Sequence, residues 1–156
     1  MKNNVYRTIV VSTAAVIVVF ISGIFSCDND SSTSNEDNGA GSTTVNGTLT
    51  LPAPANGVDY SVIIDNNLDG DDGFITITNG TCGPGITVNY AIENVNAGTY
   101  YIYAIVWVIG GNAPQNGDYL GIFGGTLNNP PAQPNAVIPD SGTVIFNIVL
   151  EVIQGW

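Results

Sequence analysis

The stretch GTYYIYAIVWVI, residues 98–109, decides the fold class of this chain. Its large apolar side chains stand at consecutive positions, so a strand here would be apolar on both faces. The two faces would consist of Tyr100, Ile102, Ala104, Val106 and Val108, and of Tyr101, Tyr103, Ile105, Trp107 and Ile109. Such a strand belongs in the middle of a sheet, where loops or a partner cover its second face.

Four other segments alternate apolar and polar residues with a period of two, which is typical of half-buried strands. They are GTLTL (47–51), DYSVIID (59–65), ITVNYAIE (86–93) and GTVIFNIVLEV (142–152). In the last segment Phe146 would point inward, together with Val144, Ile148, Leu150 and Val152. Turn-forming runs of Gly, Pro and Asn separate the strands, and no segment shows sustained helical periodicity. We therefore predict an all-β chain that folds as a single antiparallel β-sandwich.

The N-terminal stretch MKNNVYRTIVVSTAAVIVVFISGIFSC has the pattern of an export signal, because two basic residues precede a long apolar run. Its end, IFSC, resembles the lipobox of bacterial lipoproteins. The resemblance implies a signal peptide at residues 1–26 and a lipid on Cys27. The alternative is an uncleaved anchor, since about 18 apolar residues nearly reach the roughly 20 that span a bilayer. Both interpretations place the rest outside the cytoplasmic membrane, because the basic residues stay inside.

The segment that follows Cys27, residues 28–44, contains no large apolar residue that could be buried. A segment of this composition does not offset the entropy lost on ordering, so we expect residues 27–44 to form a flexible tether. Residues 45–156 are long enough for one domain with its own core. We expect this domain to be held at the bacterial cell envelope, on the periplasmic face or on the cell surface.

The charge composition excludes several functions. The chain has 13 acidic residues, no histidine, and only two basic residues, Lys2 and Arg7. A domain without cations cannot neutralise phosphates, so we expect no nucleic-acid binding. Serine–histidine and cysteine–histidine catalysis, and catalytic lysines, are excluded as well. A two-carboxylate glycosidase remains compatible with the composition, but no two acids stand out as a facing pair. We therefore expect a protein that is not an enzyme.

The stretch IENVNAGTYYIYAIV, residues 92–106, resembles a strand, turn and aromatic strand found in exported bacterial proteins. The similar modules are the prealbumin-like (transthyretin-like) and carboxypeptidase-regulatory-like β-sandwiches. The resemblance implies a prealbumin-like or Ig-like sandwich in which residues 96–99 form the turn and Tyr100 opens the next strand.

The acidic stretch DNNLDGDDG, residues 65–73, is the first candidate site. It matches the beginning of the D-x-[DN]-x-[DN]-G calcium pattern, in which alternate oxygen ligands converge on one point. The predicted ligands are Asp65, Asn67, Asp69, Asp71 and Asp72. Thr76 occupies the position of the usual closing glutamate. Two interpretations stay open, a weak Ca²⁺ site and a solvated turn in which Asp and Asn favour the bends.

Five aromatic residues make the second candidate site: Tyr101, Tyr103, Trp107, Tyr119 and Phe123. Aromatic side chains on a strand face can stack on sugar rings or form a protein interface, although their ordinary role is core packing. The leading hypothesis is a membrane-tethered, non-enzymatic binding or structural domain that is assisted by Ca²⁺ and has an unknown protein or glycan partner. The alternative is a carbohydrate-binding module.

Cys82 would have no disulfide partner in the chain if Cys27 carries a lipid. Its thiol is then either shielded inside the domain or half of an intermolecular bridge.

Overall fold

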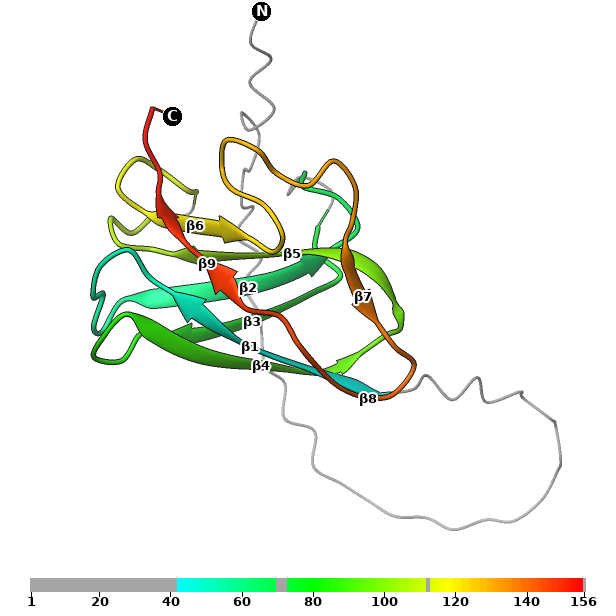
Figure 1. The fold of residues 1–156 in the computed structure, drawn as a ribbon. Coiled ribbons are helices and arrows are strands. Elements are labelled where there is room, and N and C mark those ends of the chain that lie inside the picture. The colour runs from blue at the N-terminus through cyan, green and yellow to red at the C-terminus, as the bar shows by residue number, and fades with distance from the viewer. Residues whose placement is uncertain (1–41, 70–72, 112, 156) are drawn as a thin grey trace, which may run out of the picture.

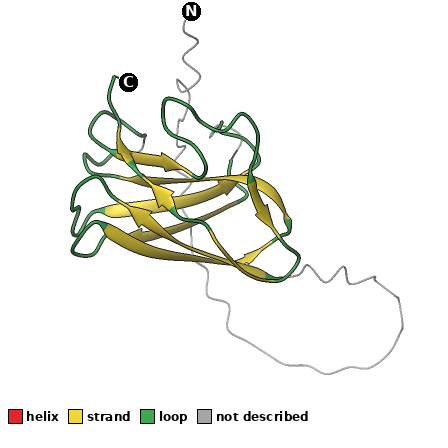
Figure 2. Ribbon diagram, viewed as in Figure 1, coloured by secondary structure: helices red, strands yellow, loops and turns green. Residues whose placement is uncertain are grey.

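A computed structural model describes residues 42–69, 73–111 and 113–155. The described residues form ten strands and no helix, and the strands pack as two layers (Figure 2). The predicted all-β sandwich is confirmed. The predicted signal peptide, Cys27 and most of the predicted tether lie outside the described residues. In the described part of the chain no helix is long and apolar enough to cross a membrane.

The first sheet is built around β1 (Thr43–Thr50), which lies between β4 (Thr87–Val95) and β8 (Gly142–Ile145). β1 runs antiparallel to β4 but parallel to β8 and to the short β9 (Ile148–Val149). β1 begins two residues before the predicted start of the domain, because Thr43 shares the buried face of Val45 and Leu49. The hydroxyl of Thr43 donates to the carbonyl of Pro139 at 2.6 Å.

The second sheet places β5 (Gly98–Val106) at its centre, as the sequence predicts. β5 pairs antiparallel with β2 (Asp59–Asp65), with β6 (Tyr119–Ile122) and with β7 (Ala136–Ile138). β3 (Thr76–Thr81) extends the sheet beyond β2, and β10 (Glu151–Val152) extends it beyond β6 (Figure 1).

The C-terminal segment is not the single strand predicted at residues 142–152. It forms β8 and β9 in the first sheet and then crosses to the second sheet as β10. Phe146 and Leu150 are buried as predicted. The prediction for Val152 is wrong: its side chain is 37% exposed, and Ile153 is buried instead. The alternation predicted for one strand ends at Leu150, because the chain then pairs with a different sheet, and Ile153 packs with Tyr103 and Ile105 on the outer face of that sheet.

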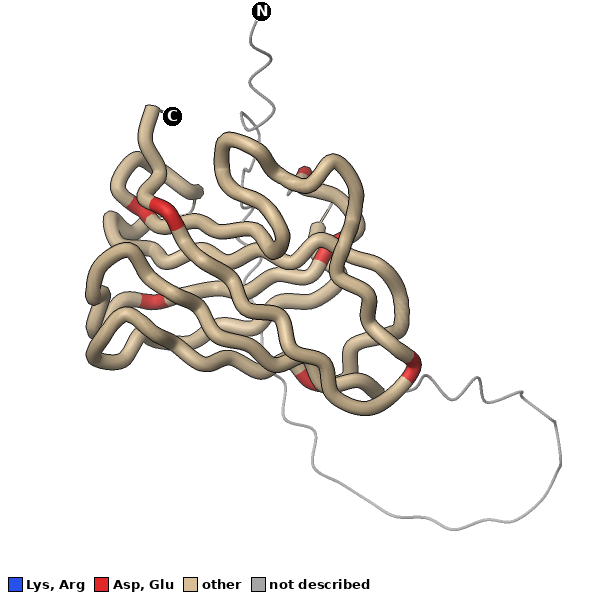
Figure 3. The backbone as a smooth tube through the Cα atoms, viewed as in Figure 1, with Lys and Arg blue, Asp and Glu red and all other residues tan. Residues whose placement is uncertain are grey.

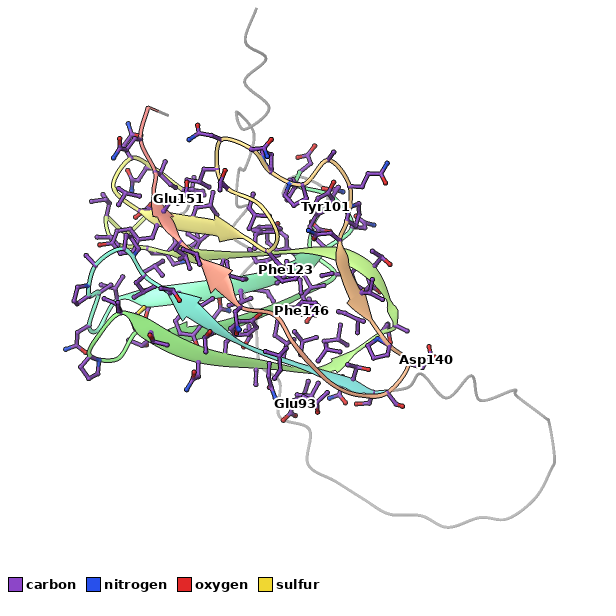
Figure 4. The ribbon with its side chains drawn as sticks, viewed as in Figure 1. Glu93, Tyr101, Phe123, Asp140, Phe146 and Glu151 are labelled. Atoms are coloured by element: carbon purple, nitrogen blue, oxygen red, sulfur yellow. The ribbon has the colours of Figure 1, made fainter. Side chains whose placement is uncertain are left out.

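The main core fills the space between the sheets. Phe146 and Phe123 meet there edge to face, with ring centroids 4.8 Å apart (Figure 4). A second apolar cluster lies on the outer face of β5, around Tyr103 and Ile105. Side chains from two loops pack against this second cluster. Leu68 and Phe74 come from one loop, and Leu127 comes from the other. The outer face of β5 is therefore covered largely by loops of the same chain.

The turn at residues 96–99 connects the two layers, because β4 and β5 belong to different sheets. β5 already begins at Gly98, where a Cβ atom would lie 2.6 Å from the ring of Tyr100. The hydroxyl of Tyr100 donates to the carbonyl of Ala97 at 3.1 Å. Glycine at this corner leaves room for the tyrosine ring to close over the backbone, and a larger residue would push the ring aside.

Candidate functional site

The five candidate aromatic residues lie on two different sides of the second sheet. Tyr101 and Tyr103 are buried in the outer cluster, where Phe74 packs edge to face on Tyr103 at 6.5 Å. Tyr119 and Phe123 lie on the opposite side of the sheet, with the main core. Only Trp107 stands beside an open hollow on the outer face. It is half-buried and follows directly after β5.

Two hollows share Trp107 and Asp59 among their lining residues. The β3-side hollow, of about 450 Å³, is also lined by Ser61, Asn79 and Thr81. The loop-side hollow, of about 470 Å³, is completed by residues 57–58 and 108–111. Both volumes lie in the range of small-molecule sites. We call the two hollows together the Trp107 groove.

Strand register brings the polar residues of the β3-side hollow together. Asp59 is opposite Thr81, and Ser61 is opposite Asn79, across the β2–β3 pair. Side chains two residues apart on a strand point to the same side, so all four lie on the outer face with Trp107. The β3-side hollow therefore depends on the pairing of β2 with its neighbour β3 and with the more distant β5.

A chain of hydrogen bonds orders these side chains. The indole N–H of Trp107 donates to Ser61 Oγ at 3.2 Å, and the Ser61 hydroxyl donates to Asn79 Oδ1 at 2.7 Å. The Thr81 hydroxyl donates to Asp59 Oδ1 at 3.1 Å. These bonds hold the indole ring and the amide in one orientation before any ligand arrives, which lowers the entropic cost of binding.

The loop-side wall is held in place by the buried carboxylate of Asp118. One oxygen accepts the backbone N–H of Ile109 at 2.8 Å, and the other accepts the backbone N–H of Gln115 at 3.0 Å. Because both oxygens are used by backbone donors, Asp118 serves the loop and does not face a ligand. The groove thus has an ordered wall on the side of residues 108–111.

The electrostatics of the described domain are entirely acidic. Figure 3 shows Asp and Glu spread over the tube, with neither Lys nor Arg among the described residues. The groove contains the exposed carboxylate of Asp59 and no cation. An anionic ligand would meet only repulsion here, because no positive charge offsets Asp59.

The start of β1, which follows Ser42, and the end of β5, which precedes Trp107, lie at opposite ends of the sandwich (Figure 1). Thr43 pairs with Val95, and after a short turn β5 starts at this same end and runs to Trp107 at the other. Eight residues of β1 separate the two ends, which corresponds to roughly 23 Å of strand.

The candidate calcium loop follows β2 at the Ser42 end. Asp65 is buried, 1% exposed, and its Oδ1 accepts the backbone N–H of Asn66 at 2.7 Å. Asn67 Oδ1 accepts the backbone N–H of Asp69 at 2.6 Å, as in an Asx turn. The other predicted ligands, Asp71 and Asp72, lie outside the described residues. Among residues 42–69, 73–111 and 113–155, no three Asp, Glu, His or Cys side chains are grouped for a metal ion.

The thiol of Cys82 is shielded, as one of the two interpretations predicts. Cys82 is buried in the main core and forms no disulfide with any described residue. Burial, and secondarily the negative charge of Asp59, raises the pKa of the Cys82 thiol. The buried thiol is therefore poorly ionised near neutral pH.

Comparisons with protein-family models, with curated proteins and with solved structures found no match. The site is therefore defined by its geometry. Sequence reasoning singled out Trp107 but missed Asp59, Ser61, Asn79 and Thr81. Their only signal in the sequence was the polar side of two strands. The pairing of β2 with β3 and with β5 was needed to bring them beside Trp107.

Proposed function

We propose that this chain is a membrane-tethered, extracytoplasmic lipoprotein whose β-sandwich binds a partner without catalysis. The observation that carries the proposal is the Trp107 groove at the end of the sandwich away from Ser42. A tether that enters at Ser42 would direct this end toward the medium. An ordered, partly apolar groove in that position suits ligand capture.

The non-enzymatic part of the proposal rests on the chemistry of the groove. Asp59 is its only carboxylate, and a hydrolytic acid–base pair requires two groups that face the same bond. Histidine and cationic residues, which act as bases and nucleophiles in many enzymes, do not occur after Arg7. The prealbumin-like resemblance is part of the same proposal, and the two-layer sandwich is compatible with it.

The calcium part of the proposal concerns the loop after β2. Carboxylate and amide oxygens on a turn are ligands that suit Ca²⁺ better than Mg²⁺, which demands near-ideal octahedral geometry. At the tether end of the domain, a bound ion would stabilise the fold and would not contact a ligand in the Trp107 groove.

The carbohydrate-binding alternative is favoured by one observation, the half-buried Trp107 among polar side chains. Carbohydrate binding at this surface would depend on the indole ring of Trp107. Tyr101 and Tyr103 are buried, and Tyr119 packs on the core side of the sheet.

The lipoprotein assignment predicts a mature chain that starts at Cys27. Mass spectrometry of the protein from bacterial membranes should find a diacylglyceryl-modified N-terminal cysteine, and Cys27→Ser should leave the precursor unprocessed. An intact chain that starts at Met1 would overturn the lipoprotein assignment in favour of an uncleaved anchor.

The binding assignment is tested by copurification from intact cells that make the full-length chain. Trp107→Ala should lose the protein or glycan that copurifies with the wild type. Ile145→Ala, a change at a 68% exposed residue on the other sheet, should retain it. Equal recovery of the partner with the wild type, Trp107→Ala and Ile145→Ala would show that the Trp107 groove is not the binding surface.

A further inference from the structure

The two hollows of the Trp107 groove indicate a ligand that is longer than one small ring. Both hollows are lined by Asp59 and Trp107, and their remaining lining residues differ. A ligand that fills both must pass along Asp59 and Trp107, with one unit in each hollow. Such a ligand is linear and has at least two units.

The polar groups of the β3-side hollow indicate what the ligand unit in that hollow carries. Asn79 uses its amide oxygen for Ser61, and no hydrogen bond among the described residues uses its amide N–H groups. Asp59, which lines the hollow, accepts from Thr81 through Oδ1, and its second carboxylate oxygen is a further acceptor. Donors beside an acceptor match neighbouring hydroxyl groups, because each hydroxyl both donates and accepts.

The N–H of the Trp107 indole is already bonded to Ser61, so the part of the ring that lines the hollows can meet a ligand through its carbon atoms. The face of an aromatic ring carries partial negative charge and attracts the weakly positive C–H groups of an apolar surface. A sugar ring has both required features, with C–H groups on one face and hydroxyl groups around its edge. An aliphatic ligand would leave Asp59 and Asn79 without partners, at an energetic cost.

The charge of the groove decides the class of saccharide. A uronic acid or a sulfated sugar would face Asp59 with no compensating cation in residues 42–156. We propose that the Trp107 groove binds a neutral, linear oligosaccharide of two or more units that stacks on Trp107 and hydrogen-bonds Asp59 and Asn79. This inference rests on the proposed binding function and names the ligand class of the same site.

Isothermal titration calorimetry on the purified full-length chain tests the inference, in a detergent without a sugar headgroup. The probes are neutral gluco-, manno- and galacto-oligosaccharides of one to six units, with oligogalacturonate as the anionic control. At least one neutral series should bind saturably, and its dimer or trimer should bind more tightly than its monomer. Oligogalacturonate should not bind, and affinity should change little between low and high salt, because no ion pair is involved.

Three variants locate the binding. Trp107→Ala should weaken it about tenfold or more, because the stacking surface is lost. Asn79→Ala, an exposed change on the edge strand β3 that leaves the indole in place, should weaken it about two- to tenfold. Ile145→Ala should bind like the wild type. Melting curves of all variants separate loss of binding from loss of folding.

Several results would overturn the inference. One is the absence of binding by every neutral series at 10 mM, a concentration roughly 100-fold above the dissociation constant of a 0.1 mM site. The others are equal affinity of the wild type and both groove variants, and binding confined to the anionic series. Salt-sensitive capture of a basic peptide would identify a cationic protein partner instead. If the saccharides fail while Trp107→Ala still loses a partner from cells, the proposed binding function stands and only the ligand class is wrong.

Discussion

Removing the ring of Phe146 tests the main core most directly. Phe146 is 8% exposed and packs edge to face on Phe123 at 4.8 Å. Its backbone is bonded on both sides: the N–H donates to Asn46 at 2.8 Å, and the carbonyl accepts the Tyr90 hydroxyl at 2.7 Å. Alanine keeps these backbone bonds, so Phe146→Ala measures the ring alone. We expect a loss of about 3–5 kcal/mol, of which about 0.5–1.5 kcal/mol comes from the ring pair.

The measurement is urea unfolding followed by circular dichroism. For a domain of this size the loss corresponds to a fall in melting temperature of roughly 10–20 °C. Ile145→Ala is the matched control, because the neighbouring side chain is 68% exposed and should cost less than about 1 kcal/mol. The packing argument is wrong if Phe146→Ala costs under about 1 kcal/mol, or if both variants lose the same stability.

The remaining predictions concern backbone approach, alkaline pH and calcium. Gly47→Ala should destabilise the domain by more than about 2 kcal/mol, because a Cβ there would clash with the carbonyl oxygen of Phe146. Gly83→Ala is the control and should be nearly neutral, because a Cβ there meets open space. Equal losses of stability in the two variants would contradict the argument. The raised pKa of buried Cys82 means that the unfolded chain releases this proton first, so stability should be intact below about pH 8.5 and fall as pH rises further. Cys82→Ala should reduce that slope in unfolding experiments between pH 8 and 10, and an unchanged slope would assign the effect to other groups. Calcium at about 10 mM, ten times a dissociation constant of about 1 mM, should raise the melting temperature by several degrees. The double change Asp65→Ala and Asp69→Ala should remove this response, and an unmoved wild-type curve would leave the loop a plain polar turn.

The central strand and the inward position of Phe146 were predictable because they depend on local alternation. A period of two reports which side chains share a face, whatever the rest of the chain does. The same reasoning failed after Leu150, where the chain leaves one sheet for the other. The alternation of residues 142–152 continues through that crossing in the sequence, so it contains no sign of the change in partner strand.

The candidate site was predictable only in part. Trp107 stood out as a large aromatic residue at the end of a strand. Tyr101 and Tyr103 stood out equally, and loops that contribute Leu68, Phe74 and Leu127 cover them. Whether an aromatic ring is open or buried depends on what distant segments pack against it, and composition alone does not carry this information.

The sequence by itself determined the strand content, the doubly apolar centre of the second sheet and the absence of cations after Arg7, because these are properties of single residues and their neighbours. The tertiary structure alone decided that Trp107, Ser61 and Asn79 form one hydrogen-bonded row. Trp107 and Ser61 are 46 positions apart, and Ser61 and Asn79 are 18 apart. The register of β2 against β3 and β5 sets these contacts, and a shift of one residue would turn each side chain to the opposite face of the sheet. Register is chosen by burial of the whole sheet, so the groove exists only once both layers have packed.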